Sequence, residues 1–118
     1  MNRKEKIKEI LRDLAARFLS INSNKSSLMT VTSIALSKDE KMAIIFFTVF
    51  PASLNDKVGQ EKFEKTALEF AKRKRSDFKE FIKENAQLGK IPQIDFEIDL
   101  GEKNRQKIDN LLNSSIPD

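Results

Sequence analysis

The sequence predicts an α+β protein in which helices pack on one face of a three-stranded sheet. Two observations support this prediction. Three short segments, 29–36, 43–50 and 92–99, are rich in β-branched or aromatic residues or alternate apolar with charged side chains, as strands do. The segments before, between and after them carry apolar residues at helical spacing. The predicted element order is therefore α-β-β-α-α-β-α.

The chain is short enough that one hydrophobic core accounts for all of it. Its 118 residues are typical of one domain, and 39% hydrophobic with 34% charged residues suits a compact protein with a heavily charged surface. We expect a single domain over residues 1–118, with an ordered core of about 3–112.

The sequence gives no sign of membrane insertion or secretion. Its longest apolar stretch, 42–51, is far shorter than the ~20 residues that span a bilayer, and the N-terminus has no apolar signal-peptide core. Cysteine is absent, which agrees with a reducing compartment. We expect a cytoplasmic protein.

The first predicted element is an amphipathic helix over about 3–20. Its apolar stripe repeats every three or four residues and consists of Ile7, Ile10, Leu11, Leu14 and Phe18. A polar loop follows. Residues 29–36 then alternate, with Met29, Val31, Ser33 and Ala35 set against Thr30, Thr32, Ile34 and Leu36.

A second strand pairs with the first in a predicted antiparallel hairpin. Residues 37–40 form a turn-like polar connection, and residues 43–50 are almost wholly apolar, which favours a buried strand. Pro51 ends this strand.

A long helical pattern starts near Gln60 and is interrupted in its middle. Its apolar stripe runs through Phe63, Ala67 and Phe70 and resumes at Phe78. Between the two halves lies a basic tetrad, Lys72-Arg73-Lys74-Arg75, whose burial without partners would be prohibitive. Two helices meeting at a bend explain the interruption; a straight helix with an exposed middle is the alternative.

The last predicted elements are a strand and a short helix. Gly89 stops the helical pattern, and Pro92 leads into a strand with Ile94, Phe96 and Ile98 on one side and Asp95, Glu97 and Asp99 on the other. Asp99 and Glu102 resemble a capping pair for a closing helix that carries Ile108, Leu111 and Leu112.

The residue types needed for most enzymatic chemistry are missing. Histidine and cysteine are absent, and the three glycines are isolated, so no phosphate-binding loop is present. Asp95, Glu97 and Asp99 could formally hold Mg²⁺, but a solvated acidic face on an alternating strand explains them better. We predict a protein that is not an enzyme and needs no cofactor or metal.

Charge is unevenly distributed along the chain. Residues 1–20 carry a net +3, residues 71–90 a net +4 and residues 91–118 a net −3. The basic tetrad is the strongest chemical signal, because arginine forks and lysine ammonium groups neutralise phosphates and release counterions. At a helix junction, first-turn N–H groups near Ser76 and Asp77 would add donors. A solubilising helix face is the competing interpretation.

Other cations extend this candidate nucleic-acid site. Lys79 and Lys83, four residues apart, continue it along the second half of the interrupted helix. Arg3 and Lys4 have a weaker claim, because acidic residues sit among the N-terminal cations and form normal helix-surface pairs such as Glu5–Lys8. The phenylalanines fit core stripes, which favours recognition of RNA backbone and shape over stacking on bases.

Three stretches resemble the ribosome-binding factor A family, which has a KH-like (type II) fold. They are Thr30-Val31-Thr32-Ser33-Ile34-Ala35-Leu36-Ser37-Lys38-Asp39 with Ala43, then Ile91-Pro92-Gln93-Ile94-Asp95-Phe96-Glu97-Ile98-Asp99, and finally Lys107-Ile108-Asp109-Asn110-Leu111-Leu112. The family usually bends its helix pair at an Ala-x-Gly segment and lacks a GxxG loop. Here Ala71-Lys72-Arg73 takes that place without a glycine.

The resemblance implies a monomeric, non-catalytic factor that binds 16S rRNA and the small ribosomal subunit during late maturation and rRNA processing, particularly in the cold. A protein-protein interaction module with a charged, solubilising surface is the alternative function.

Overall fold

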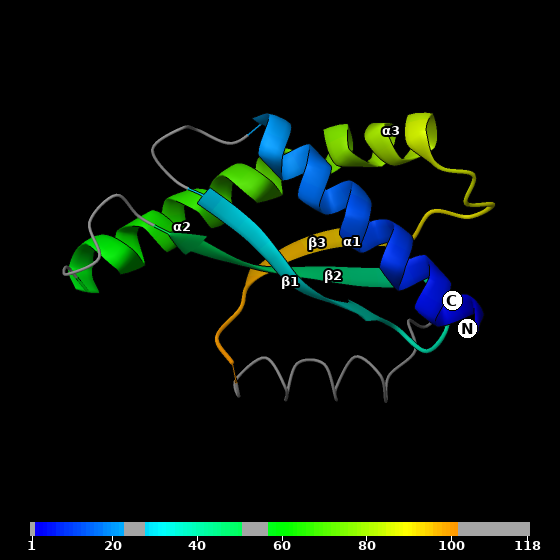
Figure 1. Ribbon diagram of the computed structural model, residues 1–118, viewed down its shortest axis with the longest axis horizontal. Coiled ribbons are helices and arrows are strands. Elements are labelled where there is room, and N and C mark those ends of the chain that lie inside the picture. The colour runs from blue at the N-terminus through cyan, green and yellow to red at the C-terminus, as the bar shows by residue number, and fades with distance from the viewer. Residues whose placement is uncertain (1, 23–27, 51–56, 102–118) are drawn as a thin grey trace.

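The protein is an α+β domain with three described helices and a three-stranded sheet (Figure 1). The computed structural model describes residues 2–22, 28–50 and 57–101. Its elements follow one another as α1 (Arg3–Asn22), β1 (Leu28–Leu36), β2 (Met42–Phe50), α2 (Lys57–Arg73), α3 (Arg75–Asn85) and β3 (Gln93–Ile98). This order confirms the predicted fold class and agrees with a KH-like arrangement. The predicted closing helix lies outside the described residues.

The sheet has the strand order β1-β2-β3, so β1 and β3 are its two edges. β1 and β2 form the predicted antiparallel hairpin, and β2 and β3 are parallel, with α2 and α3 in the connection between them. Ile45 pairs with Phe96 and Phe47 with Ile98, so that register brings apolar side chains together on one face.

A buried serine organises the hairpin turn. Ser37 is 1% exposed, and its hydroxyl donates to Asp39 at 2.7 Å. The same oxygen accepts hydrogen bonds from the backbone N–H groups of Lys41 (3.1 Å) and Met42 (3.0 Å). Glu40 takes a left-handed conformation with φ of 62°, which a non-glycine residue adopts only at some cost. The Ser37 side chain thus satisfies turn N–H groups that the ladder leaves unpaired.

The uninterrupted alternation predicted for residues 29–36 is wrong at Thr32. The register shifts there, because Val31 pairs with Phe47 whereas Ser33 pairs with Phe46. Thr32 is therefore the extra residue of a β-bulge. Met29 and Leu36, predicted on opposite faces, consequently both join the main core.

The bulge is explained by contacts that are distant in sequence. The Thr32 hydroxyl donates to the carboxylate of Asp99 at 2.5 Å and lies 3.3 Å from the carbonyl oxygen of Phe46. Beyond the bulge, Ala35 packs with Phe46 in a small second cluster, separate from the main core.

The main core lies between the sheet and the three described helices, which all pack on one face. Four aromatic rings cross it in a chain. Phe18 of α1 lies 5.1 Å from Phe78 of α3, Phe78 lies 5.7 Å from Phe96 of β3, and Phe96 lies 6.3 Å from Phe47 of β2. Tilted and edge-on ring pairs at such distances are favourable beyond their burial. They fix α3 relative to the sheet and to α1.

The helix boundaries differ from the predicted ones by a few residues. α2 begins at Lys57, before Gln60, and α3 ends at Asn85, four residues before Gly89. The N–H of Ala86 donates to the carbonyl oxygen of Ile82 at 2.9 Å, so the C-cap residue satisfies one carbonyl of the last turn, and the amide of Asn85 donates to the carbonyl oxygen of Phe81. In the part of the chain that the structure describes, no helix is both long and apolar enough to cross a membrane.

Candidate nucleic-acid interface

The basic tetrad lies at a break between α2 and α3, which confirms the prediction of two helices meeting at a bend and not the straight-helix alternative. Lys72 and Arg73 end α2, Lys74 forms the break with φ −94° and ψ 7°, and Arg75 begins α3. The N–H of Lys74 is shared between the carbonyls of Phe70 (3.2 Å) and Ala71 (3.1 Å), the tightened geometry typical of a helix end. No glycine is needed, because these backbone angles are open to any residue.

Two buried side chains hold the junction in place. Ala71, in the last turn of α2, and Phe78, in the first turn of α3, are both fully buried. The tetrad lies between these two anchors, so its cations cannot rotate into the core and their backbone positions are fixed. Figure 1 shows α2 and α3 as separate helices that meet at this point.

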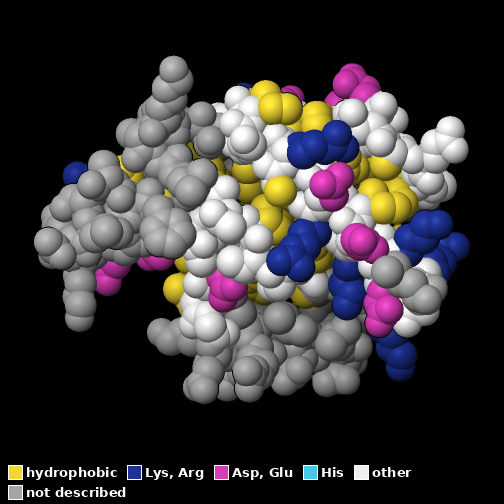
Figure 2. Space-filling view, viewed as in Figure 1, with side chains coloured by type: hydrophobic (Ala, Val, Ile, Leu, Met, Phe, Trp, Pro, Cys, Tyr) yellow, Lys and Arg dark blue, Asp and Glu magenta, His cyan; other side chains and the backbone are white. Residues whose placement is uncertain are grey.

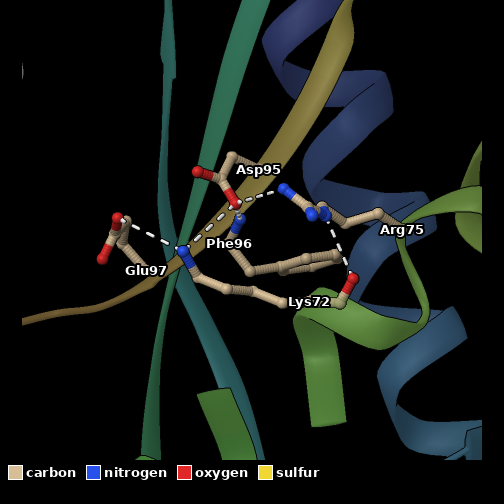
Figure 3. A network of polar contacts seen from close by, with 5 residues as sticks. All are labelled: Lys72, Arg75, Asp95, Phe96 and Glu97. Carbon is tan, nitrogen blue, oxygen red and sulfur yellow. Dashed lines mark hydrogen bonds and ion pairs between the residues drawn. The ribbon is translucent and has the colours of Figure 1, made fainter. Parts of the chain in front are cut away.

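On one side of the junction, two cations are paired with strand β3 (Figure 3). The Nη1 of Arg75 lies 3.3 Å from Oδ1 of Asp95, and the Nζ of Lys72 lies 3.6 Å from the same oxygen. Lys72 Nζ also lies 4.0 Å from Oε1 of Glu97. Arg75 Nε donates to the carbonyl oxygen of Lys72 at 3.0 Å, which links the two helices.

This network also covers the open edge of the sheet. The backbone N–H of Phe96 donates to Oδ1 of Asp95 at 2.9 Å, so the edge strand satisfies one of its unpaired groups with its own side chain. Asp95 and Glu97 were expected on a solvated face; instead their side chains are only 28% and 22% exposed. The local sequence does not reveal this role, because the cationic partners of Asp95 and Glu97 lie about twenty residues earlier.

The other side of the junction is more open. Arg73 is exposed, and it has no ion-pair partner among the described residues. Lys74 Nζ lies 3.7 Å from Asp77, whose side chain is 67% exposed, and 5.8 Å from the ring centroid of Phe70. Exposed pairs of this kind are worth at most about 1 kcal/mol, so Lys74 can exchange its partner readily.

Backbone donors lie next to these cations. No side chain caps the N-terminus of α3, and within the described residues the N–H groups of Arg75, Ser76 and Asp77 have no backbone acceptor. The first helical hydrogen bond runs from Phe78 N–H to the carbonyl of Lys74. The helix N-terminus therefore presents unpaired donors and the positive end of its dipole beside Arg73 and Lys74.

Lys79 and Lys83 differ in their partners, although both lie on α3. Lys83 Nζ lies 3.3 Å from Glu80 in an exposed pair. Lys79 is half-buried and has no ion pair with any described residue.

The structure does not bring Arg3 and Lys4 to the junction. Arg3 Nε pairs with Glu40 of the hairpin turn at 3.1 Å. It is the far end of α1, through Phe18, that touches α3. Fifteen residues separate Arg3 from Phe18, which corresponds to about 22 Å of helix. Arg3 and Lys4 therefore form a separate basic region.

On the face shown in Figure 2, Lys and Arg side chains alternate with Asp and Glu along α1 and form no continuous basic patch. Arg17 and Asp13, 3.5 Å apart, are one such pair. An open groove of about 440 Å³ between α1 and β1 has the same mixed character, because Glu5, Lys8, Glu9 and Arg12 line it together with Thr32, Ser33 and Ile34.

The described residues support neither base stacking nor metal binding. Among them, the exposed large apolar side chains are Ile21 and Leu100, neither of them aromatic. Phe63, Phe70 and Phe81 are partly buried against the core, so no exposed ring in this part of the chain favours base stacking. The same residues contain no group of three or more candidate ligands that could hold a metal ion.

Comparisons with known proteins agree with this architecture. The chain is 26% identical over 106 residues to ribosome-binding factor A from Kosmotoga olearia, an alignment that covers 90% of this chain and 78% of that protein. The crystal structure of ribosome-binding factor A from Thermus thermophilus superposes with a TM-score of 0.62 at 18% identity, covering 80% of this chain and 93% of that one.

A second solved structure has the same fold. The NMR structure of a Thermotoga maritima protein, proposed to be a ribosome binding factor A, gives a TM-score of 0.61 at 20% identity over 96% of this chain and 92% of its own. The family's sequence profile, described as ribosome-binding factor A, matches residues 3–112. The chain therefore belongs to the ribosome-binding factor A family.

Proposed function

We propose that this protein binds the small ribosomal subunit through 16S rRNA during late maturation and rRNA processing, as one non-catalytic cytoplasmic domain. Family membership supports the ribosomal role. The observation that supports an RNA contact is the concentration of the basic tetrad at a helix break held by Ala71 and Phe78.

The proposed contact is electrostatic. Within the basic tetrad, Arg73 and Lys74 would neutralise phosphates together with Lys79 and, more weakly, Lys83, whereas Lys72 and Arg75 are paired with Asp95. The α3 N-terminus would add backbone donors. Arg3 and Lys4 would make at most a second, separate contact. A rigid basic surface can favour one rRNA arrangement by binding it better than the alternatives, which requires no turnover. Such a contact would matter most in the cold, where RNA rearranges slowly.

Co-sedimentation with purified small subunits tests this proposal. Subunits from wild-type cells and from cells that accumulate precursors should both be tried, and we expect binding to the precursor form, weakened steeply by added salt. A variant with four reversals, Lys72→Glu, Arg73→Glu, Lys74→Glu and Arg75→Glu, should bind far less. Binding to neither subunit preparation, or equal binding by the variant, would contradict the proposal and favour a protein-protein interaction module.

A further inference from the structure

The two sides of the helix junction differ in what already occupies their cations. On the side that faces β3, three donors converge on one oxygen, Oδ1 of Asp95. They are the N–H of Phe96 at 2.9 Å, Nη1 of Arg75 at 3.3 Å and Nζ of Lys72 at 3.6 Å. A backbone N–H, a guanidinium and an ammonium together form the kind of donor set that holds a phosphate oxygen. Here the protein's own carboxylate fills it.

This internal anion is difficult for a phosphate to displace. Asp95 is covalently part of the strand, and its carboxylate accepts a hydrogen bond from the backbone N–H of Phe96, so its local concentration is far above that of any free anion. Glu97, 4.0 Å from Lys72, adds a second negative charge at the same edge. A phosphate that approaches β3 would therefore meet two carboxylates before it reached the two cations.

The other side of the junction, here called the outward side, carries Arg73 and Lys74, and no described carboxylate there competes with phosphate as Asp95 does. Arg73 has no described ion-pair partner, and the partner of Lys74, Asp77, is 67% exposed on the next turn of helix. The uncapped first turn of α3 lies beside them. A phosphate arriving on this side displaces mainly water.

Building on the proposed function, we propose that Asp95, assisted by Glu97, determines where RNA binds on this protein. These carboxylates withhold Lys72 and Arg75 from phosphates and keep the β3 edge closed to the RNA backbone. RNA then binds on the outward side, through Arg73, Lys74 and the α3 N-terminus. Asp95 and Glu97 thus limit the interface, although neither touches RNA.

Neutralising the carboxylates tests this inference. Asp95→Asn keeps an oxygen acceptor for Phe96 N–H, and Glu97→Gln preserves size. The control, Glu61→Gln with Glu64→Gln, changes net charge equally, eight or more residues before Lys72. That spacing is about 12 Å along α2, beyond the Debye length of ~10 Å at 0.1 M salt. The probe is a fluorescein-labelled double-stranded RNA hairpin, titrated over a range of salt concentrations.

We expect the Asp95→Asn, Glu97→Gln variant to bind the hairpin about tenfold more tightly at 0.1 M salt. The slope of the logarithm of its binding constant against the logarithm of salt concentration should become more negative by about one to two, because each new phosphate contact adds ~0.9 to the magnitude of that slope. The control should match wild type within about twofold. If the variant behaves like the control while Arg73→Glu, Lys74→Glu weakens binding, the inference is wrong and the RNA site stands. If wild type does not bind RNA at all, the proposed function itself fails.

A measurement on the wild-type protein guards against a variant that does not fold. The Nε–H resonances of Arg73 and Arg75 can be followed by NMR during titration with the same hairpin. We expect the Arg73 signal to shift or broaden and the Arg75 signal to stay in place, because Arg75 Nε remains bonded to the carbonyl oxygen of Lys72. A shift of the Arg75 signal as large as that of Arg73 would overturn the inference.

Discussion

The helix junction and the N-terminal half of α1 are both basic, yet the fold uses their charges differently. In α1, cations alternate with acids, and Arg3 is tied to the hairpin turn through Glu40. At the junction, four consecutive cations lie between two buried anchors and beside an uncapped helix N-terminus. Net charge is similar in the two regions, so their difference shows that position and partners, more than charge alone, make a candidate phosphate site.

The largest expected effect comes from removing the anchor of the junction. Phe78 contacts Phe18 and Phe96 and is fully buried, so Phe78→Ala should lower the free energy of unfolding by about 3–5 kcal/mol. Urea denaturation followed by circular dichroism measures it. RNA affinity should fall as well, although no cation is changed. A loss below about 1 kcal/mol would mean that the aromatic chain does not hold α3.

A second variant destabilises the region near Arg3 without touching the junction. Ser37→Ala leaves the N–H of Met42 without its side-chain acceptor and the N–H of Lys41 with Asp39 alone, which should cost about 1–3 kcal/mol. Ser20→Ala, at an exposed position of α1, is the control and should be nearly neutral. RNA affinity of the folded Ser37→Ala protein should equal that of wild type; a clear decrease would place RNA near the hairpin turn.

The two lysines of α3 allow a comparison at equal charge. Lys79→Glu should weaken RNA binding about tenfold, which corresponds to about 1.4 kcal/mol, because Lys79 has no ion pair with a described residue. Lys83→Glu should weaken it less than about threefold, because Lys83 is paired with Glu80 near the end of the helix. Fluorescence anisotropy with labelled rRNA measures both. The reverse order would shift the interface toward the C-terminal end of α3.

The smallest effect concerns the ion pair between Arg3 and Glu40. Arg3→Ala should change stability by less than about 1 kcal/mol, because the Arg3 side chain is 77% exposed and such pairs contribute little. Thermal denaturation at low and high salt measures the change. A larger, salt-insensitive loss would show that this contact fixes α1 to the turn.

Most of the fold was predictable because its signals are local. The alternation of Ile94, Phe96 and Ile98 with acidic residues predicted β3, and the interrupted apolar stripe predicted the break between α2 and α3; the structure confirms both. The bulge at Thr32 was not predictable, because the Asp99 carboxylate that accepts the hydrogen bond from the Thr32 hydroxyl lies 67 residues away in the sequence.

The candidate site was predictable only as a set of charges. The basic tetrad stands out in the sequence, but nothing there shows that Lys72 and Arg75 face Asp95 while Arg73 faces solvent. That division depends on the angle at which α2 meets α3 and on the position of the β3 edge. Both are tertiary properties, and local spacing does not encode them.

The most direct measurement compares two matched charge reversals as RNA binding is titrated with salt. Arg73→Glu with Lys74→Glu and Arg3→Glu with Lys4→Glu change net charge equally, in two different places. The Arg73→Glu, Lys74→Glu variant should bind RNA about 100-fold more weakly at 0.1 M salt, and the slope of log affinity against log salt concentration should become shallower by about two. The Arg3→Glu, Lys4→Glu variant should lose less than about threefold in affinity. Equal losses in the two variants would contradict the account, because net charge alone would then explain binding.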